Sequence, residues 1–312
     1  MARPRNRFVD WLEYLGARLL AMFAQMFGPR PNYRAGRLVG EMLWRLDRRH
    51  RRIACEHVRL SFPDWPEDRV RRVARKSMHN LAYLGLEVLL TPRLITPTRW
   101  QRHVRLRNMS ELLRLLIRQD GGIILLTGHF GNFEVVGYTM ATLGFATYSV
   151  ARPLDNVRLW EYLVRLLGQT GQRFLYKKGA MGAIPSHLDA RQAVSFVADQ
   201  DAGRRGLFVD FFGRPASTYK SIGLLAVRHK VPVAIGYGKR LDDTTFRFEV
   251  GVQRVIYPRE WAGRNDAPEW VTREFTRELE NIVRAAPEQY LWVHRRWKHR
   301  PDGTKAGGHG IA

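Results

Sequence analysis

The chain has little cysteine and no long uninterrupted apolar run. Among its 312 residues Cys55 is the single cysteine, so an intramolecular disulfide is excluded and a reducing compartment is favoured. No stretch of about 18 or more uncharged apolar residues occurs, so the sequence contains no clear transmembrane helix. There is also no internal repeat, no zinc-finger spacing and no RNA-recognition aromatic motif. These absences leave a globular α/β or helical protein of ordinary apolar content.

Acidic residues are scarce relative to basic ones. The 52 Lys and Arg residues outnumber 29 Asp and Glu residues, which gives a formal net charge of +23. Such an excess favours an anionic partner: nucleic acid, an anionic membrane surface or an acidic protein. An arginine-rich composition with no dedicated partner is the alternative, because the basic residues are spread along the whole chain. Without a compact basic tract, we expect no nucleic-acid partner.

The most apolar segment near the N-terminus is residues 11–28, which still contains Glu13 and Arg18. Its apolar residues recur at helical spacing: Trp11, Leu15, Leu19, Met22, Phe23 and Met26. Arginines flank the segment on both sides, so we predict that residues 1–35 form a helix that associates with a membrane surface. An amphipathic helix packed on its own domain is the alternative. A cleaved signal peptide is disfavoured because no small-residue cleavage site follows.

The hydrophobic pattern changes near Gly121. Residues 1–118 are predicted to be mostly helical, with one helix from Asp64 or Glu67 through Met78, another over 80–90 that Pro92 ends, and a third from Ser110. Beyond Gly121, strands are predicted at 122–127, 147–151, 173–176, 193–198, 231–237 and 246–252, and helices at 135–143, 157–167, 221–229 and 269–285. This alternation predicts an α/β fold with a central, mostly parallel sheet flanked by helices. We expect one domain over residues 36–301 and a disordered Gly-rich tail over 302–312.

The segment from Gly128 to Glu134 follows the first predicted strand. In one continuous helix His129 and Glu134 would point about 140° apart, by 3.6 residues per turn. Their spacing is useful if His129 lies in the loop at the end of the strand and Glu134 in the first turn of the next helix. Asn132 suits the N-cap of that helix, and Gly131 permits a sharp turn. The carboxyl ends of strands collect ligands in open α/β sheets, so His129 is predicted to lie in a binding site.

A histidine beside a carboxylate is a general-base arrangement, because the carboxylate fixes the tautomer and stabilises the imidazolium. The sequence has no Gly-x-Ser-x-Gly nucleophile motif, and Cys55 lies far upstream. His129 would therefore activate an acceptor hydroxyl directly, with Glu134 orienting it. The alternative is that His129 packs and Glu134 merely complements the helix dipole. A metal site is disfavoured because no second His or Cys stands nearby, and we expect no cofactor.

Five sequence blocks in order resemble one family. They are Gly128–Glu134, Ala151–Asn156, Lys177–Met181, Asp199–Gly203 running on to Phe211–Thr218, and Pro287–Trp292 followed by His294–Lys298 and Arg300–Pro301. Together they resemble the lipid A biosynthesis lauroyl/myristoyl acyltransferases, a branch of the His-x4-Asp/Glu lysophospholipid-acyltransferase-like superfamily. Residues 10–301 carry the resemblance. The chain departs from the family in its N-terminal segment, which carries two charges where members often have a clearer membrane anchor.

The resemblance implies transfer of a fatty acyl chain from a thioester, usually on acyl carrier protein, to a hydroxyl of a phosphorylated glycolipid. It implies work at the cytoplasmic face of the inner membrane, through a peripheral contact or a single N-terminal anchor. His129 and Glu134 match the catalytic pair, and Asp199 matches an acidic position on which the family relies. Further residues are expected to support substrate binding: Arg152, Arg165, Asp201, Arg204 and Arg214.

Several alternatives stay open at this stage. Arg204, Arg205 and Arg214 suit bidentate binding of phosphates, but an ion pair between one of them and Asp199 or Asp201 is equally consistent with the pattern. The basic, aromatic stretch 292–298 is predicted to be a final strand with no catalytic role. For the whole protein, the rivals are acylation of another glycolipid such as a mannosylated phosphatidylinositol, and a catalytically silent lipid-binding member.

Overall fold

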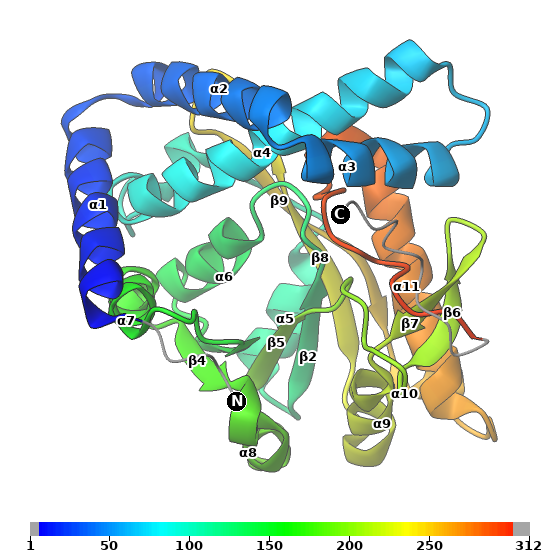
Figure 1. Ribbon diagram of the computed structural model, residues 1–312. Coiled ribbons are helices and arrows are strands. Elements are labelled where there is room, and N and C mark those ends of the chain that lie inside the picture. Colours follow the sequence, from blue (N-terminus) through cyan, green and yellow to red (C-terminus); the bar gives the residue numbers. More distant parts are fainter. Residues whose placement is uncertain (1–5, 302–312) are drawn as a thin grey trace.

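The computed structural model describes residues 6–301 and, except at residues 177–181, their side chains. The expected tail over 302–312 therefore lies outside the described residues, as do the side chains of the Lys177–Met181 block. Four helices form the N-terminal region: α1 (Arg7–Met26), α2 (Pro29–Leu46), α3 (Arg48–Ser61) and α4 (Glu67–Leu94). Figure 1 shows α2 and α3 along one end of the molecule and α1 descending beside α7. The helix expected near residues 11–28 is thus confirmed, although it begins and ends earlier.

Helix α4 corrects one sequence prediction. Two helices were expected, with Pro92 ending the second, but the structure has one helix from Glu67 to Leu94. Pro92 lies in the last turn, where its missing amide costs a single hydrogen bond and the chain continues for two more helical residues. A single long helix lets residues near Asn80 and Glu87 reach the middle of the sheet.

The central sheet has seven strands in the order β1-β9-β8-β2-β5-β3-β4. Its strands are β1 (Val104–Arg107), β2 (Ile123–Thr127), β3 (Thr147–Ala151), β4 (Arg173–Tyr176), β5 (Ala193–Val197), β8 (Val233–Arg240) and β9 (Phe248–Ile256). All pairings are parallel except that of β8 with β9. The predicted α/β fold with a mostly parallel sheet is confirmed. The sequence pattern missed β1 and the separate hairpin of β6 (Leu207–Phe211) and β7 (Arg214–Thr218).

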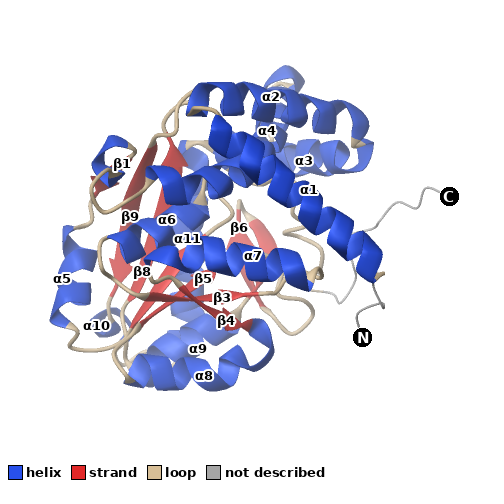
Figure 2. Cartoon of the chain, turned by 90° about the vertical axis from the view of Figure 1, so that its left-hand side faces the viewer, coloured by secondary structure: helices blue, strands red, loops and turns tan. Residues whose placement is uncertain are grey.

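Helices cover both faces of the sheet, as Figure 2 shows for α6 and α7 on one side and α8 and α9 on the other. The remaining elements are α5 (Ser110–Arg118), α6 (Phe133–Thr142), α7 (Val157–Leu167), α8 (Lys177–Asp189), α9 (Lys220–His229), α10 (Pro258–Trp261), α11 (Ala267–Ala285) and the short 3-10 helices η1 (Trp100–Arg102), η2 (Gly168–Thr170) and η3 (Pro287–Gln289). Helix α8 was not expected. Strand β2 lies between β8 and β5 and is covered on both faces, which explains its continuous apolar sequence.

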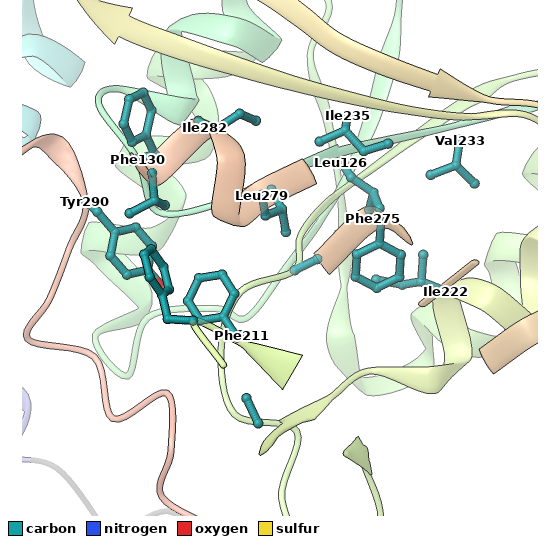
Figure 3. Close-up of a cluster of buried hydrophobic side chains, with 14 of the residues drawn as sticks. Leu126, Phe130, Phe211, Ile222, Val233, Ile235, Phe275, Leu279, Ile282 and Tyr290 are labelled. Carbon is teal, nitrogen blue, oxygen red and sulfur yellow. The ribbon is translucent and has the colours of Figure 1, made fainter. Parts of the chain in front are cut away.

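The core around α11 joins distant parts of the chain. Figure 3 shows Phe275 and Leu279 of α11 among apolar side chains of β2, β8, α9 and the hairpin. Phe130 and Tyr290 lie at one end of this cluster, and each is 2% exposed. Phe130 directly follows His129, so the core fixes the backbone of the predicted catalytic loop.

Helix α1 leaves many apolar side chains uncovered. Between 37% and 67% of each of these residues is exposed: Phe8, Val9, Trp11, Leu12, Leu15, Leu19, Leu20, Met22, Phe23 and Met26. Helix α1 packs on α4 and α7 through its other face. Across residues 6–301, no helix combines the length and the apolar character needed to cross a bilayer.

Candidate active site

His129 and Asp199 come together because of strand pairing. Strand β2 pairs in parallel with β5, and Thr127 lies opposite Val197 in the last pair of this ladder. Each chain continues for two residues, to His129 and to Asp199, at the carboxyl edge of the sheet where ligands of such folds bind. The Nδ1 atom of His129 lies 2.6 Å from Oδ1 of Asp199. The backbone amide of His129 donates to Oδ2 of the same carboxylate at 2.8 Å.

The Asp199 carboxylate therefore sets the chemistry of His129. Burial alone would raise the pKa of Asp199, but the positive charge and hydrogen bonds of His129 lower it well below its usual range. An ionised carboxylate only accepts hydrogen bonds, so Nδ1 carries the proton and Nε2 is left as the proton acceptor. The side-chain nitrogen of Gln200 lies 3.3 Å from this Nε2, in keeping with an accepting Nε2.

Glu134 lies where the sequence placed it, in the same cavity as His129 but without a hydrogen bond to it. The Asn132 side chain accepts from the Val135 amide at 3.1 Å, which confirms Asn132 as the N-cap of α6 and puts Glu134 in the first turn. In the part of the chain that the structure describes, no hydrogen bond joins Glu134 to His129, whose Nδ1 is taken by Asp199. The hydrogen-bond partner of the ring is therefore Asp199, which follows the adjacent strand, and the predicted role of Glu134 stays a prediction. Burial raises the pKa of Glu134 to about 7, and the His129 charge opposes this rise.

His129 and Glu134 line one cavity of about 760 Å³. Its remaining wall is largely apolar: Phe133, Val150, Ala151, Arg152, Leu154, Trp160, Leu163, Val164, Leu167, Phe174, Phe196, Val197, Gln200, Tyr219, Ser221 and Ile222. Four of these residues lie on α7, the helix against which α1 packs. A mostly apolar cavity of this size with a few polar groups is typical of a small-molecule or lipid-chain site.

The C-terminal segment, residues 289–299, binds the loop that contains His129, and the sequence analysis gave it no catalytic role. The Gly131 amide donates to the Gln289 carbonyl at 2.9 Å, and the Leu291 amide donates to the His129 carbonyl at 3.0 Å. The ring of His294 lies 4.4 Å from that of His129. Burial and the nearby His129 lower the pKa of His294 to about 4, so it is neutral at pH 7.

Residues 292–298 are not the strand that we expected, since they form turns and bends, and Tyr290 before them makes an isolated bridge with Phe130. Arg296 is 2% exposed and donates to the Ser217 carbonyl at 2.6 Å and to the Thr218 hydroxyl at 2.6 Å. The aromatic and basic composition therefore serves burial against the β6–β7 hairpin. The partners of this buried arginine lie far away in the sequence and follow no periodic pattern, so the sequence alone could not reveal the contact.

The other predicted site residues are only partly brought together. Arg152 lines the cavity and also pairs with Asp155 at 3.2 Å. The remaining predicted arginines, Arg165, Arg204 and Arg214, are exposed and are not among the residues lining the cavity. Asp201 pairs with His299, Nδ1 to Oδ2 at 2.7 Å. The alternative in which Asp199 or Asp201 pairs with Arg204, Arg205 or Arg214 is not the arrangement observed, because histidines pair with both carboxylates.

A buried ion pair is hydrogen-bonded to Asn132, at the end of the loop that contains His129. Arg240 of β8 donates to both oxygens of Glu87 of α4, at 2.5 and 2.8 Å, and each residue is at most 2% exposed. Glu87 also accepts from the Tyr33 hydroxyl at 2.6 Å and from the Asn132 side chain at 3.0 Å. Asn132 is the N-cap of α6, so this network connects the N-terminal helices to the helix that carries Glu134. Neither half of the network was apparent in the sequence, since its partners lie 45 to 153 residues apart.

Sequence comparisons with known proteins identify the family of this chain. The family model of the bacterial lipid A biosynthesis acyltransferases matches residues 4–299. The chain is 27% identical over 308 residues to the lipid A biosynthesis lauroyltransferase of Escherichia coli K12, with 94% of each chain covered. It is 26% identical over 304 residues to the palmitoleoyltransferase of the same pathway in that organism, covering 95% of this chain and 94% of the relative.

A lipid A biosynthesis acyltransferase of Haemophilus influenzae is 26% identical over 269 residues, covering 82% of this chain and 78% of the relative. Residues 4–299, which the family model matches, contain all the strands of the sheet, His129, Asp199 and the C-terminal segment up to His299. The chain is an acyltransferase and belongs to the bacterial lipid A biosynthesis acyltransferase family.

Proposed function

We propose that the protein transfers a fatty acyl chain from an acyl carrier protein thioester to a hydroxyl group of a phosphorylated lipid A precursor. The observation that carries this proposal is the placement of His129, held by Asp199, on the wall of a largely apolar cavity of about 760 Å³. The cavity offers a water-poor channel for an acyl chain, and the histidine offers a base. The printed names of the relatives, a lauroyltransferase and a palmitoleoyltransferase, add that fatty acyl groups are moved in this family.

The reaction requires one proton transfer and one exchange of bonds at the thioester carbonyl. Nε2 of His129 accepts the proton of the acceptor hydroxyl as its oxygen attacks the thioester carbon. The new C–O bond forms, the C–S bond breaks, and His129 returns the proton to the departing thiolate. The enzyme forms no covalent intermediate in this scheme. The Gln200 amide, beside Nε2 in the cavity wall, is placed to donate to the developing oxyanion.

The two carboxylates divide their work in this proposal. Asp199 fixes the tautomer of His129 and stabilises the imidazolium, because it is ionised and hydrogen-bonded to Nδ1. Glu134 contributes through its charge, since it interacts electrostatically with His129 without a hydrogen bond. Arg152, at the cavity and 77% exposed in its side chain, is available for a substrate phosphate.

The surface suits anionic and membrane-bound substrates. A net charge of +23 attracts both an acidic carrier protein and lipid phosphates. The uncovered apolar face of α1 suits a helix lying in the headgroup region of a bilayer. We therefore place the protein on the cytoplasmic face of the inner membrane, attached as a peripheral protein through α1.

The proposal is tested by incubating the purified protein with acyl carrier protein thioesters of several chain lengths and a lipid A precursor. Mass spectrometry should show the acceptor lipid gaining one acyl group, and His129→Ala should abolish the gain in a variant that circular dichroism shows to be folded. A mannosylated phosphatidylinositol offered in the same way tests the alternative acceptor. If wild-type protein acylates only that lipid, the proposed acceptor is wrong. If it binds lipid and acylates neither, the protein is a silent lipid-binding member.

A further inference from the structure

A second hollow lies away from the catalytic cavity, at the corner where α1 turns into α2. It has a volume of about 420 Å³. Three segments line it: the turn over residues 28–31, residues 102–103 before β1, and residues 245–247 before β9. Strands β1 and β9 form one end of the sheet, whereas His129 and Asp199 follow β2 and β5 in its middle. We call this hollow the corner groove.

Each segment contributes one arginine to the corner groove. Arg30, Arg102 and Arg247 are all exposed, and no ion pair or hydrogen bond of their guanidinium groups occurs within residues 6–301. Some arginines elsewhere on the surface have carboxylate partners, as in Arg59 with Glu67 and Arg284 with Glu280. No acidic residue lines the corner groove. Three arginines from distant parts of the sequence thus border one hollow that has no carboxylate among its lining residues.

The floor of the corner groove is apolar. Pro29, Pro31 and Phe246 lie between the arginines, and Phe246 is 1% exposed. A free inorganic anion needs no such floor, whereas a phosphate attached to a glycerol backbone and acyl chains presents both characters at once. One guanidinium group can donate two parallel hydrogen bonds to two oxygens of a phosphate. Three arginines around one hollow therefore suit the phosphate of a lipid headgroup.

The corner groove is continuous with the apolar face of α1. Met26 and Phe27, at the end of α1, are 67% and 50% exposed and immediately precede the turn that lines the groove. At the other end of the helix, the Asn156 side chain donates to the Asp10 carbonyl at 2.8 Å, which ties α1 to the start of α7 and the wall of the catalytic cavity. A helix of this length spans about 30 Å. The catalytic cavity and the corner groove therefore border opposite ends of one exposed apolar helix, whose course is visible in Figure 2.

We propose that the corner groove binds the headgroup phosphate of an anionic phospholipid in the bilayer that receives α1. This inference rests on the membrane attachment in the proposed function and goes beyond it by assigning residues and a ligand class. The corner groove and the start of α1 then contact the bilayer at two points about 30 Å apart, the length of α1. Two such contacts fix how the protein is rotated on the membrane. The cavity wall at α7 is then held at the level of the lipid from which the acceptor comes.

Vesicle binding by the full-length protein tests the corner groove. Affinity is measured by co-sedimentation with phosphatidylcholine vesicles and with phosphatidylcholine vesicles containing phosphatidylglycerol. The triple variant Arg30→Ala/Arg102→Ala/Arg247→Ala should lose about 100-fold in affinity for the phosphatidylglycerol vesicles, since each basic residue at an anionic surface contributes about fivefold. Its binding to phosphatidylcholine alone, which depends on α1, should not change.

A charge-matched triple variant is the control. Arg114, Arg118 and Arg228 are exposed, have no side-chain partner within the described ranges, and lie on α5 and α9 toward the amino edge of β2 and β8. Their replacement by alanine removes the same charge and should weaken binding only a few fold. Equal losses in the two triple variants would overturn the corner groove in favour of diffuse attraction. Wild-type affinity in the first variant would overturn it as well.

Two further arms make the result decisive. Inorganic phosphate should compete with vesicles no better than chloride at equal ionic strength, and selective displacement by phosphate would mean that the site takes a free anion. Circular dichroism melting checks that each variant is folded, and the single exchange Arg247→Glu, compared with Arg228→Glu, replaces the triple if it is not. If the wild-type protein binds vesicles as expected but shows no acyl transfer, the proposed reaction is wrong and the proposal for the corner groove is unaffected.

Discussion

Two histidine–aspartate pairs in this molecule have the same local geometry and different surroundings. In the first, Asp199 accepts from the His129 amide at 2.8 Å and lies 2.6 Å from its Nδ1. In the second, Asp201 accepts from the His299 amide at 3.2 Å and lies 2.7 Å from its Nδ1. The two carboxylates belong to one loop after β5 and are separated only by Gln200.

What differs is the space around the second ring nitrogen. His129 shares a cavity with Gln200 and Glu134, whereas His299 is not among the residues lining that cavity. The second pair ties the C-terminal segment to the loop. A carboxylate that accepts hydrogen bonds from both the amide and the ring of a histidine is therefore a structural contact found in both pairs. In the proposed mechanism the open cavity, and not the pair itself, allows His129 to act as a base.

The largest expected effect separates the two histidines. His129→Ala should reduce acyl transfer by at least about 10⁴-fold, because it removes the proton acceptor as well as the imidazolium. His299→Ala should keep most of the wild-type kcat, with only a lower melting temperature. Steady-state kinetics on both folded variants measures this. Comparable losses of kcat in the two would show that the cavity does not distinguish the pairs.

The next largest effect separates the two carboxylates. Asp199→Asn should lower kcat by on the order of 10³–10⁴-fold, because an amide facing Nδ1 favours the tautomer whose Nε2 carries the proton. Asp201→Asn should instead lower the free energy of unfolding by about 1–2 kcal/mol with little change in kcat. Denaturant unfolding and kinetics on the same samples test both parts. A wild-type kcat for Asp199→Asn would remove Asp199 from the mechanism.

Two glycines sharpen the comparison in terms of backbone strain. Gly131 and Gly203 both have positive φ, +55° and +83°, and each follows one of the pairs by two residues. A Cβ at Gly131 would lie 2.0 Å from the Gly238 carbonyl oxygen, whereas one at Gly203 meets nothing within 4 Å. Gly131→Ala should therefore destabilise the fold by at least about 3 kcal/mol, and Gly203→Ala by about 1 kcal/mol. Similar unfolding midpoints for both variants would contradict this reading of the turn.

The smallest effect concerns pH. The pKa of Glu134 is raised to about 7 by burial, so the folded protein binds a proton there that the unfolded chain releases above about pH 4.5. Its contribution to stability is complete below pH 4.5 and is lost as the pH rises through 7. Glu134→Gln should remove this part of the pH dependence. If ionised Glu134 assists His129, the kcat of the wild-type protein should rise near pH 7, where Glu134 ionises, and the kcat of Glu134→Gln should not.

The sequence was sufficient for the regular parts of the fold. Strand β2, the turn at Gly131 and the cap at Asn132 follow from local patterns of apolar residues and helix starts. Strand β1 is short and only half apolar, and the β6–β7 hairpin lies beside a charged loop, so neither has a clear period. Sequence separation explains why Asp199 was known only by resemblance, since its contact with His129 depends on the pairing of β2 with β5. The contacts of His294 and Arg296 depend on packing alone.

The C-terminal segment that binds the His129 loop has a consequence for truncation of the chain. The partners of the His129 carbonyl and the Gly131 amide are Leu291 and Gln289, which lie beyond α11. A chain that stops before them lacks two backbone hydrogen bonds of this loop, although it still contains every strand of the sheet. Removal of the C-terminal segment is therefore expected to change the geometry of the site itself and not only the stability of the fold.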